Sequence, residues 1–277
     1  MSRPLRSHIL ALASGAIATL GASCGLELPE GLAPDARQLA DDAVDSQDTI
    51  AIATSIAGVP ALVLSGESLS LAEVVERQQQ IASFFDQAAC IEVEADGNTV
   101  SYVLDECTGP WGFVKVSGRE TVTFAPGPTA NSFAVELESD GLEINGKAAT
   151  HSGSAVITLF PDRRTIELTG SYDGTALLGP REVHHDLDIR VDVFDDGALR
   201  VDGASSTEVG VRGVELEVND YERAGPKGIC PTGVLTAKRS LTALEVTLTF
   251  DGSRELLVES SRGGHDTFDL ECEPAGG

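Results

Sequence analysis

The sequence predicts an all-β body: an antiparallel meander of about a dozen strands, as a curled sheet, sandwich or barrel-like fold, with one N-terminal helix. Beyond residue 90, apolar and polar residues alternate over many short runs, which is the period of half-buried strands. Turn signals such as Asp-Gly separate these runs at intervals of about 8–15 residues, as in consecutive hairpins. The hydrophobic content of 42% is enough to build a core.

The chain begins with a segment that has the layout of a secretory signal peptide, residues 1–23. Two arginines, Arg3 and Arg6, precede an apolar run over residues 9–20, and small residues follow it. This run is too short to span a bilayer as a helix. We therefore expect export of the protein and removal of this segment.

The residues around Cys24 resemble a bacterial lipoprotein signal. Gly21, Ala22 and Ser23 stand directly before the cysteine, although the leucine typical of this family, Leu20, lies one place further away than usual. The resemblance implies cleavage before Cys24, acylation of that residue and attachment to a membrane through the lipid. The alternative is ordinary cleavage near Ala22 or Ser23, which would leave a soluble secreted protein.

The cysteine count agrees with lipidation. Five cysteines cannot all pair, and export makes disulfides their usual fate. If Cys24 carries a lipid, four remain and allow three connectivities, of which we expect the pairs closest in sequence. These are Cys90–Cys107 and Cys230–Cys272. No Cys-x-x-Cys pair occurs, so no metal site is expected at these residues.

Residues 24–66 are expected to be the lipidated cysteine and an acidic spacer, solvated over residues 25–48, where acids dominate and prolines interrupt them. Some helix over residues 36–57 is left open, and the apolar run over residues 50–64 is expected to pack against the folded body. Residues 67–277 are expected to form the folded body. The body opens with a helix over about residues 70–88, where Ser70 and Glu73 form a capping box.

The strands follow from Cys90 onward, where the apolar period changes from 3.6 to 2 residues. Clear alternation covers residues 91–94, 100–104, 186–193, 214–219 and 246–250. Turn pairs are expected at Asp96-Gly97, Asp140-Gly141, Asp173-Gly174, Asp196-Gly197, Arg212-Gly213 and Asp251-Gly252. An outer-membrane barrel is not expected, because the polar face of the strands is rich in carboxylates and aromatic girdles are absent.

The charge excludes several classes of partner. The chain carries 44 acidic and 19 basic residues, a formal net charge of −25. Nucleic-acid binding needs clustered Lys and Arg to neutralise phosphates, so no nucleic-acid partner is expected. The only membrane contact predicted is through the N-terminal lipid, and a protein or glycan partner is left open.

The sequence predicts no catalytic residues, no metal and no cofactor, so we do not expect an enzyme. His184 and His185 are adjacent in a strand and point to opposite faces, so they cannot ligate one metal by local geometry. His151 is expected to be isolated. Three carboxylate pairs each share a strand face and could serve a glycosidase or bind Ca²⁺, although such pairs are also ordinary on a solvated face: Glu92/Glu94, Asp186/Asp188 and Glu215/Glu217.

The whole pattern resembles uncharacterised acidic surface lipoproteins of Gram-negative bacteria of the myxobacterial type. These also combine a lipoprotein signal, an acidic spacer and a β-rich body with a hairpin similar to Cys107-Thr108-Gly109-Pro110. We expect an exported cell-envelope lipoprotein with a structural or binding role. Gly25 after the anchor favours the outer membrane. The alternatives are a polysaccharide hydrolase that uses a carboxylate pair on the sheet and a carrier with an apolar cavity under the helix.

Overall fold

The computed structural model describes residues 31–43, 46, 58, 60–61, 63–64, 69–85, 87–108, 115–175, 182–195, 198–209, 212–223, 229–239, 242–270 and 272. The expected signal peptide and Cys24 lie outside these residues.

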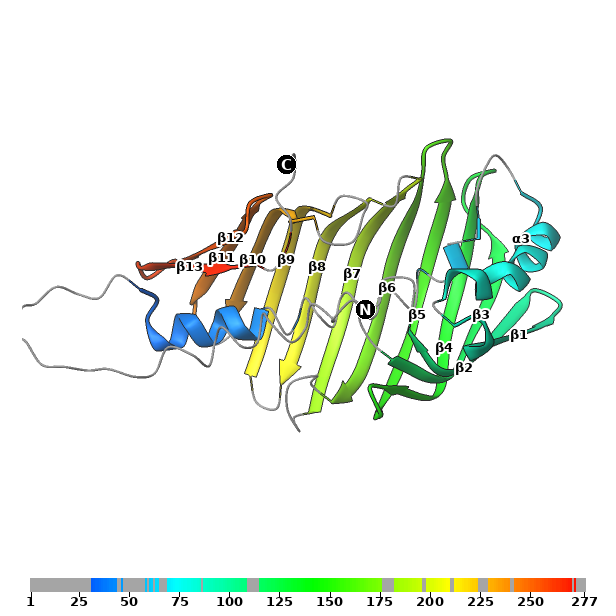
Figure 1. Cartoon of the computed structure of the whole chain (residues 1–277), viewed down its shortest axis with the longest axis horizontal. Helices are drawn as coiled ribbons and strands as arrows, with labels where there is room; N and C mark the ends of the chain where they lie inside the picture. The colour runs from blue at the N-terminus through cyan, green and yellow to red at the C-terminus, as the bar shows by residue number, and fades with distance from the viewer. Residues whose placement is uncertain are drawn as a thin grey trace, which may run out of the picture.

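The body is one antiparallel sheet of 13 strands in which every strand pairs with its neighbours in sequence, from β1 to β13 (Figure 1). The predicted all-β meander is confirmed. The expected arrangements were a curled sheet, a sandwich or a barrel-like fold. The structure has a single sheet that is not closed, because β1 and β13 lie at its two ends and do not pair. The strands are β1 Ile91–Asp96, β2 Thr99–Thr108, β3 Lys115–Pro126, β4 Ser132–Ile144, β5 Lys147–Leu159, β6 Arg163–Thr175, β7 Glu182–Phe194, β8 Leu199–Val209, β9 Arg212–Arg223, β10 Thr232–Arg239, β11 Glu245–Asp251, β12 Glu255–Ser260 and β13 His265–Asp269.

One face of the sheet carries the core, as the two-residue alternation requires. In β7, Leu187, Ile189 and Val191 are buried while Asp186 and Asp188 are exposed. Helical segments lie over this face at both ends of the sheet: residues 34–43, in blue, at the β10–β13 end, and α3 at the β1–β4 end (Figure 1).

The expected helix over 70–88 begins where the capping box predicts but changes type. Helix α3, Leu71–Arg77, is followed by the 3₁₀ segments η1, Gln78–Phe84, and η2, Ala88–Cys90. The Ser70 hydroxyl accepts from the Glu73 N–H, and the Glu73 carboxylate accepts from the Ser70 N–H. The change from α-helix to 3₁₀-helix follows from Gln78, because its side-chain Nε2 donates to the Val74 carbonyl oxygen at 3.3 Å. The backbone N–H of Gln78 bonds instead to the Val75 carbonyl, which is the tighter 3₁₀ pattern.

The expected turn at Asp140-Gly141 is instead a β-bulge within β4. The β4–β5 register shifts by one residue between Glu138 and Leu142, and Gly141 has φ of 60°. A bulge bends the strand locally. The bulge also brings β4 close to the backbone of Gly118 on β3. A Cβ added to Gly118 would stand 2.4 Å from the Gly141 carbonyl oxygen. The same Asp-Gly dipeptide therefore serves as a bend inside a strand and not as a hairpin.

The expectation of a solvated spacer does not hold for the described residues of 25–48. Residues 34–43 are helical. Leu32, Ala36, Leu39, Ala40 and Ala43 of this region are between 0% and 7% exposed and belong to the main core. The apolar stripe consists largely of alanines, so the acidic residues between them dominate the composition. Ala61 and Leu64 are also buried in the core, as expected for the run over residues 50–64, so the folded body includes the described residues between 31 and 64.

Candidate functional site

The four body cysteines form the two expected disulfides. Cys90–Cys107 has a Cα–Cα distance of 5.2 Å, and Cys230–Cys272 one of 4.9 Å. The first joins η2 to β2 and closes 17 residues, and the second joins the chain before β10 to the C-terminal segment and closes 42. By loop entropy they stabilise the fold by about 3 and about 4 kcal/mol.

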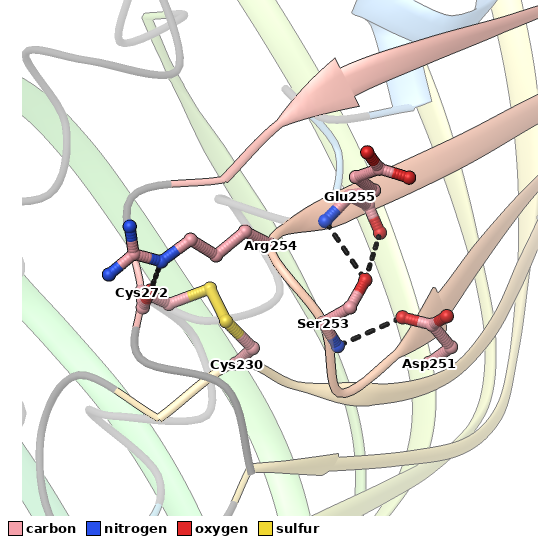
Figure 2. The surroundings of a disulfide bond; sticks show 6 residues. All are labelled: Cys230, Asp251, Ser253, Arg254, Glu255 and Cys272. Carbon is pink, nitrogen blue, oxygen red and sulfur yellow. Dashed lines mark hydrogen bonds between the residues drawn. A yellow bond between two sulfur atoms is a disulfide. The ribbon is translucent and has the colours of Figure 1, made fainter. Parts of the chain in front are cut away.

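The second disulfide lies beside the β11–β12 turn (Figure 2). Arg254 in this turn donates through Nε to the Cys272 carbonyl at 2.9 Å. Ser253 donates its N–H to the Asp251 carboxylate at 2.9 Å, and the hydrogen bonds from Ser253 lower the pKa of Asp251. These contacts hold the C-terminal segment on the turn, which is a structural role.

A groove of about 620 Å³ lies on the exposed face of the sheet over β6–β9. Its polar lining consists of Glu167, Asp188, Arg190, Asp202, Glu217 and Asn219. The β8–β9 register shifts at this place between Val201 and Gly203. Gly203 has φ of 133°, and an added Cβ would stand 2.4 Å from the Asp188 carbonyl oxygen. The groove therefore lies where β9 bulges against β8 and where the absence of a side chain on Gly203 leaves room for the Asp188 carbonyl of β7.

Arg190 is the basic centre of this acidic groove. Its cross-strand neighbours are Glu167 on β6 and Asp202 on β8. Its guanidinium also lies 3.4 Å from the buried carboxylate of Asp192, which accepts a hydrogen bond from Thr165 at 2.5 Å. The groove can therefore offer both carboxylate acceptors and one guanidinium donor to a polar ligand.

The predicted carboxylate pairs have different fates. Asp188 and Glu217 line the groove, but their predicted pair members Asp186 and Glu215 do not. Glu94 instead bonds to Arg119 on β3 at 2.7 Å. Ala204 is the cross-strand neighbour of both Asp188 and Glu217, so these two positions are two strand spacings apart, about 9.6 Å. The groove thus brings together one carboxylate from each of two predicted pairs, from β7 and from β9.

His184 and His185 face opposite sides of β7, as predicted. His184 is exposed and bonds to Asp173 at 2.7 Å, and this hydrogen bond raises its pKa. His185 is fully buried, with Nδ1 hydrogen-bonded to the Thr207 hydroxyl. Burial lowers the pKa of His185 to about 4. Only one of the two is therefore a solvent-facing histidine.

The expectation that His151 is isolated is wrong. Its Nδ1 lies 3.3 Å from the Glu120 carboxylate, and both residues are 2% exposed. A carboxylate on Nδ1 orients the imidazole and leaves Nε2 as the free ring nitrogen. His151 Nε2, Glu120 Oε2 and His185 Nε2 have no hydrogen-bond partner among the described residues. Each such buried atom costs about 1–3 kcal/mol, so these groups are present despite a cost in stability.

These groups belong to one row across the apolar face. Cross-strand pairing links Tyr102 to Glu120, and links Tyr172 to both His151 and His185. The Tyr102 hydroxyl donates to Gln78 Oε1 at 2.7 Å, and burial raises the pKa of Tyr102 well above its usual value. Sequence reasoning missed Glu120. The available signal was the two-residue period of β3, in which Glu120 occupies a position on the same face as the apolar Val116, Val122 and Phe124.

Within the described ranges, no cluster of three or more His, Cys, Asp or Glu residues could hold a metal ion. Among the helices that the structure describes, none has the length and apolar content needed to cross a membrane. No family model, curated protein or solved structure matches this chain.

Proposed function

We propose that this protein is an exported cell-envelope lipoprotein, tethered through Cys24, whose β body has a structural or binding role. The observation that carries the proposal is the pairing of the cysteines. Cys90, Cys107, Cys230 and Cys272 are all in disulfides, which form in oxidising compartments outside the cytosol. Among the five cysteines this leaves Cys24, directly after the small residues of a signal-like segment.

The sorting habit of Gram-negative lipoproteins supports the outer membrane as the destination, because Gly25 and not Asp follows the anchor. The acidic body supports a protein or glycan partner over an anionic one, since a net charge of −25 repels anionic surfaces. The groove over β6–β9 offers such a partner a polar hollow on the described part of the sheet. Its acceptors and single guanidinium are suited to hydrogen-bonding a glycan.

The test is metabolic labelling of the full chain in a Gram-negative host with an alkyne-bearing palmitate. We expect label in the wild-type protein, recovery in the membrane fraction and an intact mass that begins at an acylated Cys24. The Cys24→Ser variant is the control and should be unlabelled. An unlipidated, soluble wild-type chain with one free thiol would overturn the proposal and favour the secreted alternative.

A second candidate is polysaccharide hydrolysis, which the groove specifically favours. The backbone positions of Asp188 and Glu217 are two strand spacings apart, about 9.6 Å, and both side chains line the groove. Inverting glycosidases hold their two carboxyl groups at a comparable separation of about 6.5–9.5 Å. We expect Asp188→Asn and Glu217→Gln each to abolish release of reducing ends from a polysaccharide panel. Glu215→Gln is the matched control, because Glu215 is exposed on the same strand outside the groove. Absence of reducing ends with the wild-type protein would remove this candidate.

The carrier alternative gains no support from the helix. The residues that α3 and η1 turn toward the sheet, Val74, Gln78 and Ile81, are each 0% exposed. Gln78 is held there by Tyr102 and by the Pro60 carbonyl at 3.1 Å. The space beneath this helix is therefore filled by side chains.

A further inference from the structure

The N-terminal end of the described chain is in direct contact with the β12–β13 turn. An added Cβ on Gly264, which lies in this turn, would stand only 2.8 Å from the Gly31 carbonyl oxygen. Gly264 has φ of 88°, a conformation in which a side chain is strained. The approach of the two backbones at this place thus depends on glycine.

Three ion pairs hold the helical residues 34–43 against the same end of the sheet. Asp35 bonds to Arg262 at 2.7 Å and Arg37 bonds to Asp266 at 2.9 Å. Asp42 bonds to Arg239 at 3.1 Å, with the two side chains 5% and 14% exposed. The buried pair is the one whose loss leaves an unpaired charge in the interior.

The same helix is fixed to the core through its apolar face. Leu39 and Ala43 are 0% exposed, and Ala36 is 1% exposed. We call the combination of this face, the three ion pairs and the Gly31–Gly264 contact the N-terminal clasp. It makes residues 31–43 part of the rigid body at the β10–β13 end.

The clasp limits how far the β12–β13 turn can lie from Cys24. Gly31 follows Cys24 by seven residues, and seven extended residues span at most about 25 Å. The opposite end of the sheet is much further away, because β1 and β13 lie at opposite ends of the longest axis (Figure 1). With 13 strands, the path across the sheet is about 58 Å.

We infer that the β12–β13 turn is the membrane-facing end of this protein and that the β1–β2 turn points away from the bilayer. The inference rests on the proposed anchoring through Cys24. It places the groove over β6–β9 about 20–35 Å from β13 along the sheet. A ligand in the groove would thus be held above the lipid surface and not against it.

The test measures energy transfer from two labelled positions to a lipid acceptor. Glu259, at the end of β12, and Asn98, in the β1–β2 turn, are both exposed. Each is replaced in turn by an azide-bearing residue and labelled with the same donor fluorophore. The acylated protein is reconstituted into phosphatidylcholine vesicles that contain a rhodamine lipid. Circular dichroism of both labelled proteins confirms that the fold is retained.

We expect transfer from position 259 to exceed that from position 98 by about two-fold or more, given the separation across the sheet. Equal transfer, or greater transfer from position 98, would overturn the inference. A second arm couples the chain that begins at Cys24 to a maleimide lipid through that thiol, and this chain keeps every described residue. Orientation is then measured even if the host does not acylate Cys24, so failure of the inference and failure of the proposed function are distinguishable.

Discussion

His184 and His185 are neighbours in β7, yet the structure shifts their pKa values in opposite directions. The folded-state pKa of His185 is lowered from 6.5 to about 4, chiefly by burial and then by the charge of His184. Between these two values the unfolded chain binds a proton that the folded chain does not. Stability is therefore lost as the pH falls from 6.5 toward 4. At 1.36 kcal/mol for each unit, this one residue removes about 3 kcal/mol.

The variant that isolates this effect is His185→Gln, which does not titrate and keeps a polar group beside Thr207. Urea unfolding followed by circular dichroism at pH 7.5, 6.5, 5.5 and 4 gives the free energy of unfolding for both proteins. We expect the wild-type protein to lose about 3 kcal/mol more than His185→Gln over this range. Titration of the carboxylates is common to both proteins and cancels in the difference.

His184→Gln is the matched control. A hydrogen bond to Asp173 raises the pKa of His184, so its stabilising contribution is present below the ordinary pKa and is lost as the pH rises. Removing His184 should change the acid loss little, because the group is exposed and screened. Loss of its own stabilising contribution and relief of its repulsion of His185 also act in opposite directions. Parallel curves for the wild-type protein and His185→Gln would refute the reasoning.

Three further outcomes are expected from thermal and urea unfolding. Tyr102→Phe leaves the Gln78 oxygen unpaired and should destabilise the fold by about 2 kcal/mol, or about 4–8 °C in Tm. Tyr172→Phe is the control and should be near neutral, because the Tyr172 hydroxyl makes no hydrogen bond within the described residues. Equal losses of stability in the two variants would contradict this. Asp42→Ala removes the ion-pair partner of the buried Arg239 and should lower the free energy of unfolding by about 3 kcal/mol. Asp35→Ala removes an exposed ion pair and should lower it by less than about 1 kcal/mol. A larger loss in Asp35→Ala than in Asp42→Ala would count against the N-terminal clasp. Added NaCl should raise Tm, because it screens the repulsion of a chain with a net charge of −25, and a flat response would argue against that repulsion.

The strands and the start of the helix could be predicted because their signals are local. Alternation along β7 requires only that successive side chains point to opposite faces, and the Ser70–Glu73 capping box needs four consecutive residues. The disulfide pairs were also predicted correctly from closeness in sequence. The end of α3 was not, because it depends on the Gln78 side chain, which bonds to Val74 and to Pro60 from a distant segment.

The N-terminal clasp was misjudged for a related reason. Acidic residues such as Asp35 and Asp42 suggested a solvated spacer, but their partners are Arg262 and Arg239 near the C-terminus. Composition records the charge of a segment and not the partner that neutralises it. The alanines between these acids pack on the sheet only because the sheet presents an apolar face to them.

By itself the sequence determined the strand period, the antiparallel meander, the likeness to a lipoprotein signal and the excess of negative charge. Each of these follows from neighbours along the chain or from simple counts. Only the tertiary structure decided that Glu120 and His151 meet in the interior, that Asp188 and Glu217 share one groove, and that residues 31–43 close on the β12–β13 turn. The physical reason is register: which residues lie opposite one another depends on bulges and on pairing between strands, and a shift of one residue moves a side chain to the other face.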